Sequence, residues 1–161
     1  MANADLFIVG EIAERKFEAN LLWRDIKYKK IGQENWMPKW MHEKIRYIYD
    51  RIEIDLLRHQ PDFATDKALI QVKNASNCDD YPTVTIQKKS YEIAKYWCKL
   101  DIPVLIIWLF PDDKFYGNWA DHIEVEESKT QRTELTGSRT PMFIVRKHQL
   151  KPLSDFLNEL R

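Results

Sequence analysis

Three polar side chains, those of Asp55, Gln71 and Lys73, are of types that together could hold a hard metal ion and activate a water molecule. Carboxylate and amide oxygens suit Mg²⁺, which keeps several of its own waters and therefore needs few protein ligands. A lysine on the same face can position the attacking water and offset the charge of a phosphate. The chemistry that this set predicts is metal-assisted hydrolysis of a phosphodiester.

Two stretches of alternating residues predict the β-hairpin that would bring these side chains together. Every second residue is aliphatic in the stretches IEIDLL and ALIQVK, which is typical of strands with one buried face. A turn centred on Phe63 would place Asp55 opposite Gln71 and Glu53 opposite Lys73. Glu53 is then either a helper at the site or a salt-bridge partner.

The same alternation has a plainer interpretation. A hairpin with aliphatic residues on one face and Asp, Gln and Lys on the other is also what a half-solvated antiparallel sheet shows. The residue pattern alone leaves both interpretations open, and the elements around the hairpin have to decide between them.

The rest of the 161-residue sequence predicts helices and strands that alternate. Apolar residues at helical spacing predict a helix over 7–23, and a short strand follows it. An extended piece leads into a helix within 83–100, and the apolar run 104–110 is typical of a strand buried on both faces. A last strand and a closing amphipathic helix are expected in 141–161. We therefore expect one α/β domain, with a central mixed sheet flanked by helices.

This order of elements resembles the αβββαβ core of the PD-(D/E)XK nuclease superfamily, over residues 8–125. That core carries an acid and a (D/E/Q)xK motif on adjacent strands, which here would be Glu-Ile-Asp at 53–55 and Gln-Val-Lys at 71–73. Gln in the motif is the variant of Mrr-like restriction endonucleases. Further pieces resemble a group of related bacterial domains: Gly10-x-x-x-Glu14, Tyr96-Trp97 and the strand that begins Ile102-Pro-Val.

The resemblance implies a metal site for Mg²⁺ or Mn²⁺. Glu14 would reach the metal or its water, and the backbone carbonyl of Val72 would join Asp55 and Gln71 as a ligand. The literal dipeptide Pro61-Asp62 lies within the predicted turn. Asp55 is therefore the preferred acid.

On the nucleic-acid side, Gln87 stands where relatives often place a residue that touches the phosphate. Lys88 and Lys89 follow it in the sequence and could line a phosphate groove. Lys plus Arg and Asp plus Glu are balanced at 25 each, which argues against wrapping a long stretch of nucleic acid. A short, salt-sensitive contact is expected instead.

The expected function is a metal-dependent endonuclease that acts on DNA in preference to RNA, with a homodimer as one arrangement. A catalytically silent module of the same fold, binding nucleic acid or a partner protein, is the alternative. A third hypothesis is an interaction subunit for a nuclease partner. The longest apolar run is too short to span a bilayer, so we expect a cytoplasmic protein with no membrane contact.

Overall fold

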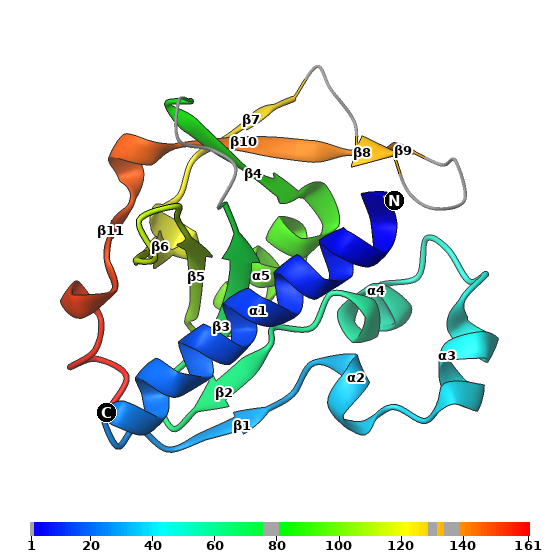
Figure 1. Ribbon diagram of the computed structural model, residues 1–161. Coiled ribbons are helices and arrows are strands. Elements are labelled where there is room, and N and C mark those ends of the chain that lie inside the picture. Colours follow the sequence, from blue (N-terminus) through cyan, green and yellow to red (C-terminus); the bar gives the residue numbers. More distant parts are fainter. Residues whose placement is uncertain (1, 76–80, 129–131, 134–138) are drawn as a thin grey trace.

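A 22-residue helix, α1 (Ala2–Trp23), lies across one face of a six-stranded sheet (Figure 1). The computed structural model describes residues 2–75, 81–128, 132–133 and 139–161. The strand order in the sheet is β1-β2-β3-β5-β6-β11, with β3 and β5 parallel and the other neighbours antiparallel. The strands are β1 (Tyr28–Lys30), β2 (Phe63–Thr65), β3 (Leu69–Asn74), β5 (Val104–Leu109), β6 (Phe115–Trp119) and β11 (Lys151–Pro152).

The opposite face of this sheet is covered by the helix α5 (Lys88–Lys99) and by a three-stranded sheet. The smaller sheet has the order β4-β10-β7, from β4 (Thr83–Gln87), β10 (Met142–Arg146) and β7 (Val125–Glu127). A two-stranded pair joins β8 (Arg132–Thr133) to β9 (Arg139–Thr140). The remaining elements are α2 (Gln33–Trp36), α3 (Lys39–Ile45), α4 (Ile52–Arg58) and the 3₁₀ turns η1 (Ala120–His122), η2 (Lys147–Gln149) and η3 (Leu153–Asp155).

The core consists of two apolar clusters, one on each face of the six-stranded sheet. Alternate residues of β5 enter them: Leu105 and Ile107 face the cluster under α1, whereas Ile106 and Trp108 face the cluster under α5. Every residue of β5 is buried, as its continuous apolar run predicts. The predicted fold class, a mixed sheet flanked by helices, is confirmed.

Two local predictions are wrong. Residues Ile52–Arg58 form the helix α4 and not a strand, so Asp55 has no strand partner in Gln71. The final strand of the C-terminal segment is present as β10, but 3₁₀ turns and the short strand β11 replace the expected closing helix. Its apolar residues Leu153, Phe156, Leu157 and Leu160 are still buried in the core, so the predicted burial is correct although the predicted helix does not form.

Gly117 of β6 is pressed against β5. A Cβ added there would lie 2.2 Å from the carbonyl oxygen of Ile106 and 2.6 Å from Cγ2 of Ile107. We expect Gly117→Ala to lower the free energy of unfolding by about 2 kcal/mol or more, because the backbone of a packed sheet must shift. Gly10→Ala is the matched control, since the space around that position in α1 is open and alanine favours a helix. Equal urea midpoints for the two variants would contradict this packing.

Within the described ranges, we find no helix with the length and apolar character needed to cross a bilayer.

Candidate active site

The β2–β3 hairpin places the carboxylate of Asp62 beside Gln71. The turn is short, because Thr65 closes it by bonding to Ala68 through both its backbone and its hydroxyl. Phe63 therefore pairs with Ile70, and the N–H of Asp62, the residue before it, donates to the carbonyl of Ile70 at 2.9 Å. Gln71 donates from Nε2 to Oδ2 of Asp62 at 3.0 Å.

Asp62 occupies an open edge of β3. Strand β2 pairs with β3 only as far as this end of the hairpin, and the N–H of Val72 donates instead to Oδ2 of Asp62, at 2.6 Å. The N–H and C=O of one strand residue point in the plane of the sheet toward the same neighbouring strand. The carbonyl of Val72 therefore also points to this edge, beside the carboxylate.

Helix α1 brings Glu14 to the same place. Its residues Ala13, Phe17 and Leu21 recur at helical spacing and are buried against the sheet. Glu14 follows Ala13 at the margin of that buried stripe. The N-terminal half of α1 is fixed to β3, because Asn74 donates from Nδ2 to the carbonyl of Val9 at 3.0 Å.

A pocket of about 260 Å³ opens where these elements meet. Helix α1 and the β2–β3 hairpin form one side, and β4 and the start of β10 form the other. The pocket is lined by Val9, Gly10, Glu14, Asp62, Gln71, Val72, Lys73, Asn74, Thr85, Ile86, Gln87 and Met142. Both acids, both motif residues and the Val72 backbone thus face one small volume.

Burial and nearby negative charge disfavour ionisation of both carboxyl groups. Burial, followed by the negative charge of Asp62 and of Glu34, raises the pKa of Glu14 to about 7. Burial also raises the pKa of Asp62 to about 6, although the Lys73 charge and the Val72 N–H act in the opposite direction. Paired acids with raised pKa values in a pocket are typical of functional sites. A cation placed between them would remove this unfavourable energy.

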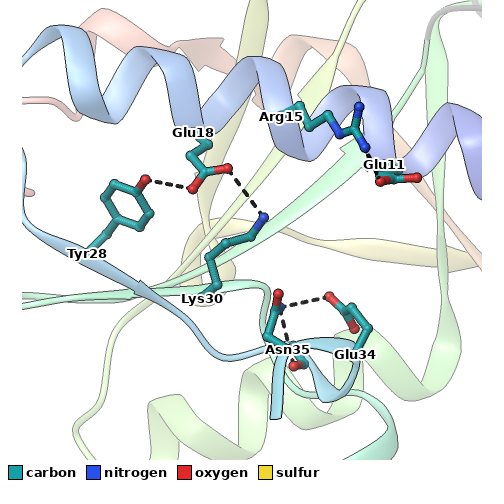
Figure 2. A network of polar contacts seen from close by, with 8 residues as sticks. Glu11, Arg15, Glu18, Tyr28, Lys30, Glu34 and Asn35 are labelled. Carbon is teal, nitrogen blue, oxygen red and sulfur yellow. Dashed lines mark hydrogen bonds and ion pairs between the residues drawn. The ribbon is translucent and has the colours of Figure 1, made fainter. Parts of the chain in front are cut away.

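A network on the neighbouring turn of α1 holds the helix against β1. Figure 2 shows Glu18 accepting hydrogen bonds from the Tyr28 hydroxyl at 2.6 Å and from Lys30 Nζ at 3.3 Å. The bond from Tyr28 lowers the pKa of Glu18, and burial raises the pKa of Tyr28 to about 12. The Lys30 charge also acts on Glu14, whose pKa it lowers. The network therefore positions the helix that carries Glu14.

The donor set fits a hard divalent cation. It comprises two carboxylates, the amide oxygen of Gln71 and a backbone carbonyl, all of them oxygen ligands of the kind Mg²⁺ prefers. Within the described ranges, no group of three or more His, Cys, Asp or Glu side chains that could hold a metal ion is found. Lys73 adds a positive charge that acts on both Glu14 and Asp62.

Asp55 is not part of this pocket. In α4 it is buried and accepts a hydrogen bond from Lys89 at 2.9 Å, and this bond raises the pKa of Lys89. Glu53 lies two residues before Asp55 in α4 and pairs with Arg51 at 3.6 Å. The expectation that Asp55 and Glu53 share a strand face with the motif is therefore wrong.

Of the three residues expected to contact nucleic acid, one lines the pocket and two do not. Gln87 lines the pocket from the end of β4. Lys88 pairs with Glu127 at 3.5 Å and lies over the ring of Phe143, outside the pocket lining. Lys89 is held by Asp55.

The Asp55–Lys89 pair predicts a stability effect. Asp55→Asn replaces the ion pair with Lys89 by a weaker hydrogen bond to a neutral amide at a buried position. We therefore expect the free energy of unfolding to fall by about 1 kcal/mol. Glu53→Gln is the control, because both members of its pair are solvent-exposed and such pairs contribute little. Urea unfolding that gives the same midpoint for both variants would exclude a structural role for Asp55.

Asp62 is the pocket residue that the hairpin prediction passed over. Its signal was present, since Pro61-Asp62 matches the acidic dipeptide of the superfamily literally. Proline also disfavours helix in the residue before it, which explains why α4 ends at Arg58 and the chain is extended by Phe63. The prediction of a strand over 52–57 placed the turn at residues 59–67, and Asp62 then fell within the predicted turn.

Comparison with known proteins gives a likeness in structure only. No protein-family model matches the sequence, and no curated protein matches it at a significant level. Among solved structures, the Holliday junction resolvase Hjc of Archaeoglobus fulgidus is similar, with a TM-score of 0.53 and 10% identity over 92% of this chain and 95% of that one. A nuclease from a fusselovirus gives a TM-score of 0.54 and 16% identity over 95% of this chain and 92% of that one. The chain therefore has the restriction-endonuclease-like fold of these two nucleases, as the resemblance in sequence predicts.

Proposed function

We propose that this protein is a Mg²⁺- or Mn²⁺-dependent endonuclease acting on DNA. The observation that carries the proposal is the pocket in which Glu14 and Asp62, both with raised pKa values, face Gln71, Lys73 and the backbone of Val72. The fold shared with two nucleases supports it. Asp62 takes the role first given to Asp55.

The metal would be held by the carboxylates of Glu14 and Asp62, by the Val72 carbonyl and by the amide oxygen of Gln71. When bound, it would polarise the phosphate and acidify a bound water molecule. Gln71 has a second role, because its Nε2 bond fixes Oδ2 of Asp62. That bond and the Val72 N–H both reach Oδ2, which leaves Oδ1 as the oxygen of Asp62 that would face the metal.

Lys73 would act on the substrate side. Its charge is within range of both acids, and it lies on the same strand face as Gln71, two residues away. We assign it the positioning of the attacking water and the compensation of charge on the phosphate. Thr85 and Gln87 on the opposite wall would bond to the phosphate oxygens.

The partner is a short stretch of DNA. The pocket volume of about 260 Å³ suits a phosphate group with its metal and waters. The balanced charge of the whole chain predicts that affinity comes from few phosphate contacts and falls with salt. A cytoplasmic protein that pairs as a homodimer to cut two strands is consistent with this use.

Incubation with supercoiled plasmid, single-stranded DNA and RNA, each with Mg²⁺, Mn²⁺ or EDTA, tests the proposal. Cleavage of DNA that needs the metal and is lost in Lys73→Ala is the expected result. Because Gln71 leaves only two carboxylates in the pocket, the silent DNA-binding module is the second candidate. Salt-dependent binding without cleavage of any substrate would favour it over the nuclease.

A further inference from the structure

The helices α2, α3 and α4 form an insertion, residues 32–61, whose two ends meet at the proposed active site. The N–H of Ile31 donates to the carbonyl of Asp62 at 3.0 Å, so the chain leaves and re-enters the sheet at the same point. Trp36 of α2 donates from Nε1 to the side chain of Gln60 at 3.2 Å. Glu34 of the same helix is near enough to raise the pKa of both Glu14 and Asp62. The two ends of the insertion therefore lie beside the pocket.

The insertion exposes an unusual amount of aromatic surface. In Figure 1 its helices follow one another outside the six-stranded sheet, with α3 farthest from it. Trp40 is 59% exposed, Tyr47 72% and Tyr49 67%. Six of the twelve large apolar side chains that are exposed in the described ranges belong to this insertion: Trp36, Trp40, Tyr47, Ile48, Tyr49 and Ile52. Core packing does not account for these rings, and a surface of this kind marks an interaction site.

Each of three exposed rings has a cation beside it. Lys44 Nζ lies 5.5 Å from the ring centre of Trp40, the Arg46 guanidinium 5.5 Å from that of Tyr47, and the Arg58 guanidinium 5.3 Å from that of Tyr49. Arg58 also donates to the carbonyl of Ile45, which fixes it between α3 and α4.

The segment that carries the exposed rings has a small positive excess, whereas the insertion 32–61 as a whole is balanced, with five Lys or Arg and five Asp or Glu. Residues 39–49 carry Lys39, Lys44 and Arg46 against the single acid Glu43. A pocket of about 400 Å³ on the insertion is lined by Lys39, Arg46 and Arg58 among others. This positive excess suits a polyanion.

Rings and cations together suit an unpaired nucleic-acid strand. Bases stack on exposed aromatic rings, and the neighbouring cations meet the phosphates between them. A continuous duplex offers phosphates but hides the faces of its bases, so it would use the cations and leave the rings idle.

We infer that the insertion, whose two ends lie beside the cleavage pocket, binds unpaired DNA bases, so that the substrate class is DNA in which a duplex meets a single strand. This inference rests on the proposed nuclease function for its biological meaning. The binding itself does not require cleavage, and it is tested without cleavage.

Fluorescence anisotropy in EDTA, with a blunt duplex and the same duplex carrying a single-stranded tail, tests the inference. The wild type is expected to bind the tailed DNA at least about tenfold more tightly, since each stacked base contributes about 1–3 kcal/mol. Trp40→Ala with Tyr47→Ala should remove this preference and leave blunt-duplex binding unchanged. Trp23→Ala is the matched control, because Trp23 is 86% exposed but ends α1, outside the insertion.

The outcomes are distinct. Unchanged tailed-DNA affinity in the double variant, or an equal loss for blunt and tailed DNA, would overturn the inference. No binding of either DNA by the wild type would also overturn it, and would leave the aromatic surface to a protein partner. The double variant should keep the wild-type thermal midpoint, and Lys44→Gln, which keeps both rings, should weaken tailed-DNA binding and its salt dependence. Failure of the nuclease proposal would show separately, as absent cleavage with this binding preference intact.

Discussion

Asp62→Asn is expected to reduce metal-dependent DNA cleavage by about a thousandfold or more. The substitution removes a charged ligand but keeps an oxygen that can accept the bonds from Gln71 and Val72, so the hairpin should stay in place. Losing one of two carboxylates withdraws several kcal/mol of the charge stabilisation that a bound metal supplies, and about 4 kcal/mol corresponds to a thousandfold in rate. Initial rates of plasmid nicking at saturating Mg²⁺ measure the effect.

Asp55→Asn is the control for this loss. It is also a buried aspartate, but it bonds to Lys89 and lies outside the pocket. It should lose stability and keep its cleavage rate when assayed well below its melting temperature. A large loss of activity in Asp55→Asn, with Asp62→Asn active, would return the catalytic role to the residue first predicted from the sequence.

Without metal, Glu14→Gln should be more stable to unfolding than the wild type at pH 8, and Mg²⁺ should reverse this order. In the metal-free protein, burial and Asp62 raise the pKa of Glu14 from 4.5 to about 7. A carboxyl group with a raised pKa in the folded state costs stability once it is ionised. This cost is absent below about pH 4.5 and complete above about pH 7. Glu14→Gln should therefore be more stable than the wild type at pH 8 and equal to it near pH 4.5.

Adding Mg²⁺ should reverse the order at pH 8. A ligand at a hundred times its dissociation constant stabilises the folded state by about 3 kcal/mol, and the wild type should bind the ion more tightly than Glu14→Gln. Thermal unfolding of both proteins across pH, with EDTA and with Mg²⁺, gives the measurement.

The quantity to measure is the difference in stability between the wild type and Glu14→Gln, because His59 also makes the stability of each protein depend on pH. Burial and the Lys73 charge lower its pKa to about 4, so the wild type also loses stability as it is acidified below about pH 6.5. Both proteins share this effect, and it cancels in their difference. A difference that stays constant from pH 4.5 to 8 would contradict the raised pKa of Glu14.

The strand with Gln71 and Lys73 and the buried strand β5 could both be predicted from the sequence. The alternation around Gln71 and Lys73 matches β3, and the apolar run matches β5, because each pattern reports which faces of a strand are buried. Val72 and Glu14 were assigned through the resemblance to the nuclease superfamily, and they line the same pocket.

The acid was harder to predict because a short apolar stretch is ambiguous. In the stretch IEIDLLR, the alternation of aliphatic and polar residues favours a strand. The same stretch can equally form a helix, and in α4 Asp55 is the residue on the buried side. Seven residues are too few for periodicity to decide between a strand and a helix. The C-terminal residues show the same limit, since Leu153 and Leu157 are buried at helical spacing although Leu153 belongs to a 3₁₀ turn and Leu157 to the turn that follows it.

Anomalous diffraction from crystals grown with Mn²⁺ would show whether the pocket between α1 and the β2–β3 hairpin binds a divalent metal. We expect a manganese peak bounded by Glu14, Asp62 and the carbonyl of Val72, and no such peak in crystals of Asp62→Asn. A peak beside Asp55, or an empty pocket at a Mn²⁺ concentration that supports cleavage, would contradict this expectation.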